Sequence, residues 1–172
     1  MPMSKATVPV FEIALQALSK MLDKAEAHAA AKKFDVGVLL NARLAPDMFA
    51  LTRQVQAVCD QAKNASARLA GVEPPKFEDT ETTLAQLKAR IGKTLDFIKT
   101  LDGKAVDASA GREIVFPLGP VKKGHMKGAD YLNHFVMPNF FFHTTAAYMI
   151  LRHNGVELGK LDFLGEIPIR IE

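Results

Sequence analysis

The stretch that decides the fold is Ala129–Asn154, ADYLNHFVMPNFFFHTTAAYMILRHN. It predicts a helix with apolar side chains on nearly every side, which is typical of a helix at the centre of a domain. Pro138 lies inside this helix and should kink it, because proline lacks a backbone donor and frees a carbonyl in the preceding turn. A helix of this kind needs other helices around it, and the rest of the chain supplies them.

Three further segments carry apolar residues at steps of three and four, the spacing of one helical face. We expect helices over Val8–Lys32, from near Pro46 to Gly71, and from near Asp79 or Thr80 to Gly103. The second start is placed at Pro46 because proline is well tolerated at the first helical position. Four amphipathic helices with short connections predict an all-α, up-and-down four-helix bundle, formed as one domain by residues 1–172.

The segments outside these helices predict smaller elements. Ile114, Phe116 and Leu118 alternate with other residues before the turn signal Gly119-Pro120, so a short β-hairpin-like excursion is expected between helices three and four. We take this part of the chain as the one long crossover of the bundle. A short helical turn is expected near Gly37–Leu40. The tail Val156–Glu172 carries apolar residues that need burial, which predicts an ordered tail.

Composition and charge exclude several classes of function. The chain has 172 residues and a net charge of only +3, which gives no support for a nucleic-acid partner. No apolar run reaches the roughly 18–20 residues that a membrane span requires. One cysteine and no recognisable export signal lead us to expect a cytoplasmic protein.

His143 is the most interesting of the five histidines, because it lies midway along the most apolar helix. It is either a ligand or general base that lines a cavity, or a hydrogen-bonded core histidine, which is the commoner case. Gln54 borders the predicted core and either pairs with His143 across the bundle or only sits at the buried edge. Cys59 fits a small buried hydrophobe better than a reactive thiol.

Phenylalanines are concentrated in the last helix, where Phe140, Phe141 and Phe142 are consecutive. Three consecutive residues cover about 300° of a helix circumference, so at least one of the rings must leave the intramolecular core. Either the tail or a second subunit must cover it. We expect a homodimer.

Three runs carry a resemblance to a known group of proteins. They are Arg43–Met48 with Arg53–Gln56, the segment Pro138–Gly155 (PNFFFHTTAAYMILRHNG), and Leu158–Gly165 (LGKLDFLG). With these runs the chain resembles an uncharacterised bacterial family that is similar to the DinB/YfiT-like four-helix bundles. The resemblance implies an up-down-down-up bundle, often dimeric. Many members of the superfamily hold a divalent metal on three histidines, and several are thiol-dependent transferases or metal-dependent hydrolases.

The sequence departs from that pattern at the implied metal site. His143 fits the first histidine position of the last helix, but Ala147 stands where the second is implied, and the second helix offers Gln54 or Gln56 instead of histidine. One imidazole and one amide make a poor site for a first-row metal. We therefore predict no metal, no cofactor and no catalytic residue. The candidate cavity is predicted to be lined by four side chains: His143, Gln54, Asn139 and Tyr148.

Three functions remain open at this point. The first is a non-catalytic bundle with a degenerate metal site that binds a small molecule or acts in stress. The second is a thiol-dependent transferase or metal-dependent hydrolase that uses His143 as a base. The third is a structural interaction module that uses the phenylalanine-rich surface, because exposed apolar patches often mark interaction sites.

Overall fold

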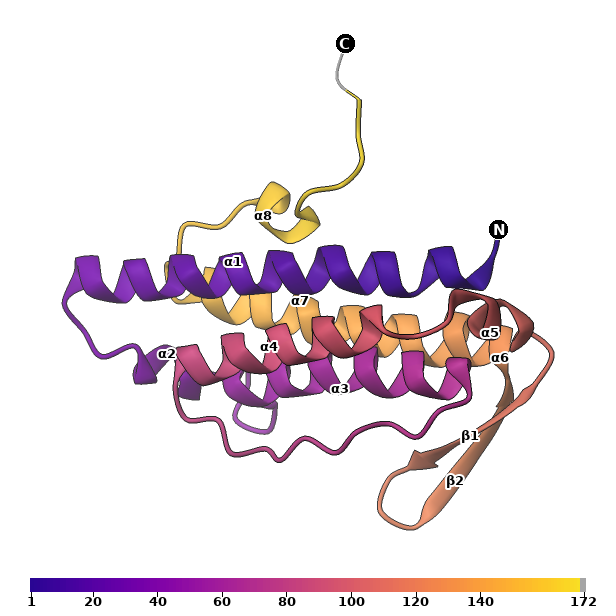
Figure 1. Cartoon of the computed structure of the whole chain (residues 1–172). Helices are drawn as coiled ribbons and strands as arrows, with labels where there is room; N and C mark the ends of the chain where they lie inside the picture. Colours follow the sequence, from indigo (N-terminus) through magenta and orange to yellow (C-terminus); the bar gives the residue numbers. More distant parts are fainter. Residues whose placement is uncertain (171–172) are drawn as a thin grey trace.

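The computed structural model describes residues 1–170. Its framework is four long helices packed side by side (Figure 1): α1 Val8–Lys32, α3 Leu51–Ala70, α4 Leu84–Lys99 and α7 Met137–His153. The shared core is apolar and draws on every one of them; its fully buried members include Phe11, Leu15, Leu18, Val55, Leu69, Leu87, Phe140 and Ile150. The predicted four-helix bundle is confirmed.

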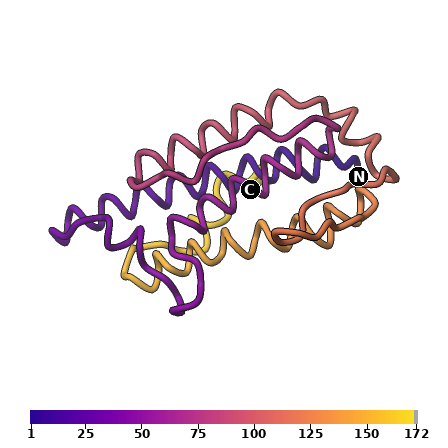
Figure 2. The backbone as a smooth tube through the Cα atoms, turned by 90° about the horizontal axis from the view of Figure 1, so that it is seen from below, coloured from indigo at the N-terminus to yellow at the C-terminus, as the bar shows by residue number. Residues whose placement is uncertain are grey.

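The chain path gives the up-down-down-up order (Figures 1 and 2). α3 and α4 run in the same direction, so residues 71–83 must travel back along the bundle to connect them; we call this segment the strap. The long crossover was expected between the third and fourth long helices, which are α4 and α7, and this expectation is wrong. α4 and α7 are antiparallel, and the end of α4 lies at the same end of the bundle as the start of α7 (Figure 1). The parallel pair α3 and α4 instead needs a connection as long as the helices themselves.

The second long helix begins at Leu51 and not near Pro46. Residues 42–50 form an irregular segment instead, held by side chains that compete with helical bonds. The Arg43 guanidinium donates to the Met48 carbonyl at 2.7 Å, and the Gln54 amide donates to the Phe49 carbonyl at 3.2 Å. A short helix, α2 Gly37–Asn41, precedes this segment, as expected. The consequence is that the Phe49 side chain lies outside the helix.

α4 begins at Leu84, later than the predicted start at Asp79 or Thr80. Thr83 is the N-cap, and it forms a capping box with Gln86, in which each side chain bonds the other's backbone N–H. The residues before it belong to the strap, because their carboxylates are engaged by cations of the bundle. α4 ends at Lys99 and is followed by α5 Gly103–Ala108, whose N-cap is Asp102.

The predicted hairpin is present at the end of the bundle where α4 and α7 meet (Figure 1). β1 Glu113–Leu118 pairs antiparallel with β2 Lys122–Lys127. Ile114 and Phe116 of β1 are buried, and the Phe116 ring lies 4.8 Å from that of Tyr131. This packing on the helices explains why two strands are enough, since an isolated hairpin is marginally stable.

The last long helix is assembled from three consecutive pieces: α6 Gly128–Asp130, the π-helical η2 Tyr131–Val136, and α7. The π turn lies directly before Pro138, where proline removes a backbone donor, and π turns are a known cause of helix bending. The Asn139 amide donates to the Phe135 carbonyl at 2.6 Å in this bend. The predicted irregularity at Pro138 therefore takes the form of a π-to-α transition.

The expectation that α7 is buried on all sides is wrong. Phe140 is fully buried, but Phe142 is 58% exposed and Met149 is 48% exposed. The two exposed side chains are seven residues apart, so they lie on one face, which is left open to solvent in the described part of the chain. The inference that one of the consecutive phenylalanines must leave the core is confirmed, and Phe142 is the most exposed of them.

The segment after α7 packs back on α1 (Figure 1). Val156 and Leu158 are buried, and the short helix α8 Lys160–Leu164 is tied to α1 by an ion pair between Asp162 and Lys24. The predicted ordered tail is thus observed in part, since Leu161 is 78% exposed, and Ile171 and Glu172 lie outside the described residues. Within residues 1–170, no helix is long and apolar enough to cross a membrane.

Candidate functional site

His143 and Gln54 meet across the interface of α7 and α3, as the sequence suggested they could. The Nδ1 atom of His143 lies 2.8 Å from Oε1 of Gln54. Because the Gln54 Nε2 group donates to the Phe49 carbonyl, its Oε1 is the acceptor, and Nδ1 of His143 carries the proton. In the neutral ring the lone pair is then on Nε2. Gln54 is 1% exposed and His143 is half-buried, so this amide fixes both the tautomer and the orientation of the imidazole.

Two phenylalanine rings flank the imidazole. The Phe49 ring is nearly parallel to it, with centroids 6.2 Å apart and an interplanar angle of 13°, and the Phe142 ring meets it edge-on at 5.2 Å. Both phenylalanines are partly exposed, Phe49 by 47%. The site is therefore an imidazole between apolar rings at the surface of the bundle.

The environment favours the neutral form of His143. Burial lowers the pKa of the imidazole from its ordinary value of 6.5, and the positive charge of Arg53 lowers it further. Arg53 lies one turn of α3 from Gln56, and its guanidinium is 5.6 Å from the centre of the Phe49 ring. At neutral pH the Nε2 atom is thus an acceptor of hydrogen bonds and not a donor.

The other two predicted site residues have different roles. Asn139 is one turn before His143 on α7, but its amide bonds the Phe135 carbonyl. Tyr148 packs edge-on against Phe163 of α8, with ring centroids 5.8 Å apart. Five residues along a helix amount to about 140° of rotation, which points Tyr148 away from His143. The structure therefore brings together two of the four predicted residues and adds Phe49 and Phe142.

The donor set does not fit the three-histidine metal centre that the resemblance implies. Ala147 occupies the position one turn after His143, and the amide oxygen of Gln54 is already engaged by Nδ1. Among residues 1–170, no group of three or more His, Cys, Asp and Glu side chains could hold a metal ion.

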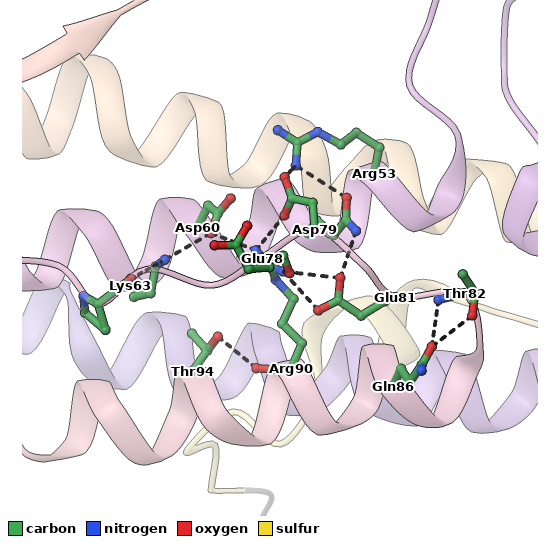
Figure 3. Close-up of polar contacts among 12 residues, drawn as sticks. Arg53, Asp60, Lys63, Glu78, Asp79, Glu81, Thr82, Gln86, Arg90 and Thr94 are labelled. Carbon is green, nitrogen blue, oxygen red and sulfur yellow. Dashed lines mark hydrogen bonds and ion pairs between the residues drawn. The ribbon is translucent and has the colours of Figure 1, made fainter.

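A second polar cluster lies between the strap and helices α3 and α4 (Figure 3). Its centre is Arg90, whose side chain is only 1% exposed and bonds three carboxylates. The guanidinium reaches Asp60 at 3.0 Å, Asp79 at 2.9 Å and Glu81 at 3.0 Å. It also donates to the Glu78 carbonyl at 2.9 Å. Arg90 thereby holds the strap against the bundle.

Two further cations and one amide complete this cluster. Lys63 lies 3.3 Å from Asp60 and donates to the Pro75 carbonyl, while Arg53 pairs with Asp79 at 2.6 Å. Gln56 donates to Glu81 at 2.8 Å. Three cations thus face three carboxylates: Arg53, Lys63 and Arg90 against Asp60, Asp79 and Glu81. We refer to these six residues and Gln56 as the ionic cluster.

The sequence analysis missed the ionic cluster. A signal was present, because Arg90 lies between Leu87 and Thr94 on the apolar stripe of its helix, and a buried arginine needs carboxylates nearby. The prediction instead placed Asp79 and Glu81 at the start of the third helix. Cys59, by contrast, is buried as expected, and burial raises the pKa of its thiol to about 12, so it is not a nucleophile.

Comparison with known proteins agrees with the four-helix fold described above. A crystal structure of a DinB family member protein from Shewanella denitrificans superposes with a TM-score of 0.90; it is 42% identical, and the match covers 99% of this chain and 96% of that one. No curated protein gives a significant match. The family model described as "Domain of unknown function (DUF1993)" matches residues 3–164. The predicted membership of an uncharacterised family with a DinB-like fold is confirmed, and the chain belongs to the DUF1993 family.

Proposed function

We propose that this protein binds a small molecule at the Phe49–His143 surface and that it does so without a resident metal. The observation that carries the proposal is the 2.8 Å hydrogen bond between Gln54 and Nδ1 of His143. This contact uses one ring nitrogen and presents the other, Nε2, as an oriented acceptor. The buried amide of Gln54 thereby holds the partly exposed imidazole in one orientation.

The surroundings of His143 restrict the chemistry of the ligand. The parallel Phe49 ring and the edge of Phe142 offer apolar surface to a planar group, since aromatic rings stack favourably at these separations. The neutral imidazole offers an acceptor and no free donor. The ligand class that fits is a planar, mainly apolar molecule that donates one hydrogen bond.

Phenol and toluene form a matched pair of probes, because toluene carries a methyl group where phenol carries the hydroxyl donor. We expect phenol to shift the His143 ring resonances saturably in NMR spectra. Toluene should bind about tenfold more weakly, as the loss of one hydrogen bond of about 1.4 kcal/mol implies. His143→Phe should remove the difference between the probes. Equal binding of both, or no saturable shift with either, would contradict the proposal.

An enzyme that uses a metal at His143 is the competing function. Elemental analysis of protein purified without chelator or affinity tag separates the two. Stoichiometric zinc or nickel that disappears in His143→Ala would overturn the non-catalytic assignment. We expect neither metal above background, because Ala147 and the engaged Gln54 leave one free imidazole nitrogen, which is too few ligands for a structural or catalytic zinc site.

We also propose that the protein is a homodimer through the exposed face of α7. Phe142 and Met149 are both about half exposed on that face, and Phe141 beside them is 38% exposed. Sedimentation at micromolar concentration should give the mass of two chains, and Phe142→Lys should give one. A monomeric wild-type protein would leave this surface to a different partner, as in the interaction-module hypothesis.

A further inference from the structure

The contact between Arg53 of the ionic cluster and Phe49 of the His143 site links the two groupings. The Arg53 guanidinium donates to Asp79 of the strap and lies over the Phe49 ring at 5.6 Å. Phe49 in turn is the ring that stacks on His143. A continuous chain of contacts therefore runs from the strap to the imidazole.

We propose that Asp79 is a positioning residue of the His143 site, whose ion pair with Arg53 keeps the guanidinium over Phe49 and thereby keeps Phe49 stacked on His143. The inference rests on the proposed binding role of that site. It makes the strap, which is remote from His143 in sequence, part of the binding surface.

The first step of the argument is that Asp79 itself is held in place. One carboxylate oxygen, Oδ1, lies 2.9 Å from the guanidinium of Arg90, and the other, Oδ2, lies 2.6 Å from Arg53. Arg90 is buried and bound to two further carboxylates, so it has little freedom to move. Asp79 therefore presents a fixed acceptor to Arg53, as Figure 3 shows.

The second step is that Arg53 depends on this acceptor. Its side chain is 41% exposed, and a long exposed side chain keeps one geometry only where a partner holds it. Its other hydrogen bond, to Oε1 of Gln56, is long at 3.4 Å. Without Asp79 the guanidinium is expected to turn into solvent.

The third step is that Phe49 depends on Arg53. Phe49 belongs to the irregular segment 42–50 and is 47% exposed, so the rigid framework does not fix its ring. Its backbone carbonyl is fixed by Gln54, but its ring has a cation on one side and an imidazole on another. Cation–π attraction favours the ring position in which both contacts are made.

The variants Asp79→Asn and Glu81→Gln separate this role from general loosening of the strap. Both remove one carboxylate from Arg90, but only Asp79→Asn removes the partner of Arg53. Glu78→Gln is a second control, because its carboxylate pairs with Lys76 within the strap. The measurements are the NMR cross-peak between the ring protons of Phe49 and His143, and the titration of His143.

We expect Asp79→Asn to reduce the cross-peak at least twofold and to raise the pKa of His143 toward its ordinary value, since the charge of Arg53 moves away. Glu81→Gln and Glu78→Gln should leave both readouts near wild type. If Arg53 stays in place, loss of the Asp79 charge should instead lower the pKa of His143 and leave the cross-peak intact. That result, or equal effects of Asp79→Asn and Glu81→Gln, would overturn the proposal.

Arg53→Gln tests the same link without touching Arg90. It should reproduce the effects of Asp79→Asn, and the double variant should add nothing further; additive effects would contradict the proposed chain of contacts. These measurements need no ligand. A failure of phenol to bind would therefore reject the proposed function alone, whereas an unchanged cross-peak in both variants would reject the positioning role alone.

Discussion

The ionic cluster and the His143 site differ in how their polar groups are compensated within the chain. In the ionic cluster, three cations face three carboxylates, and Arg90 alone engages Asp60, Asp79 and Glu81. Around His143 there is one hydrogen bond between neutral groups, and one ring nitrogen keeps its lone pair. The charges of the first grouping are compensated within the chain, and we propose that the second accepts a hydrogen bond from a ligand.

This difference separates a structural role from a binding role. A buried charge is tolerated only when partners compensate it, so the ion pairs of Arg90 report on what the fold requires. The hydrogen bond between Gln54 and His143 satisfies Nδ1 of the imidazole but leaves Nε2 without a partner among the hydrogen bonds of the described residues. This contrast supports the proposed binding role of His143 and a structural role of Arg90.

Removal of Arg90 should have the largest effect on stability. Arg90→Ala leaves Asp60, Asp79 and Glu81 without their shared cation and releases the strap, and the loss of one partner of a buried ion pair typically costs about 3–5 kcal/mol. Urea denaturation followed by circular dichroism measures the change in the free energy of unfolding. The matched control is Lys88→Ala on the same helix, whose exposed ion pair with Asp23 should be worth about 1 kcal/mol or less. Similar losses for the two variants would remove the structural role assigned to the cluster.

Removal of Gln54 should have the next largest effect. Gln54→Ala leaves the Nδ1–H group of His143 and the Phe49 carbonyl without their partner, and one unsatisfied buried group costs about 1–3 kcal/mol. The same denaturation measurement applies, with Gln61→Ala on α3 as the control. The variant should also lose the tenfold preference for phenol over toluene, because the imidazole is no longer held in one tautomer. A stability loss with the preference retained would mean that Gln54 only fills space.

Acid should weaken the ionic cluster before it affects the apolar core. Desolvation raises the pKa of Glu81, but hydrogen bonds from Arg90 and Gln56 outweigh it, and the net pKa is lowered from the ordinary 4.5. A carboxylate with a lowered pKa stabilises the fold above its unfolded-state pKa and loses that contribution as pH falls through the folded-state value. Unfolding free energy should therefore fall below about pH 4.5, and Glu81→Gln should flatten this part of the profile. An unchanged profile in Glu81→Gln would assign the acid sensitivity to other groups.

The helical framework could be predicted from sequence because burial repeats along one face of each helix. α1 begins and ends at the predicted residues, Val8 and Lys32, and the hairpin follows its alternation and turn signal. The starts of α3 and α4 could not be predicted, because the residues before them are held by contacts with distant parts of the chain. Asp79 binds Arg53 and Arg90, and the Phe49 carbonyl binds the Gln54 side chain, so local helix preference is overruled at both places.

The candidate site, like the helical framework, could be predicted from the sequence only in part. His143 and Gln54 were identified because each is a polar residue on an apolar stripe, and such residues need a partner when buried. Phe49 could not be found, because its position depends on where α3 begins. Tyr148 was predicted to line the same cavity, but the rotation of the helix turns it toward α8.

The smallest of these effects is expected for Phe142, and it tests whether the exposed face of α7 belongs to function and not to the core. The sequence alone predicts a cost of about 3–5 kcal/mol for Phe142→Ala, as for any buried phenylalanine. With the ring 58% exposed, we expect about 1 kcal/mol or less, because little surface is uncovered and alanine is the better helix former.

The matched control is Phe140→Ala, two residues earlier. The Phe140 ring is fully buried, with its centroid 4.8 Å from that of Phe11, so this variant should show the full cost. Denaturation measurements at a concentration where both variants have the same oligomeric mass exclude a contribution from subunit association. If Phe142→Ala then costs as much as Phe140→Ala, the ring is part of the core, and the surface assigned to a ligand beside His143 is lost with it.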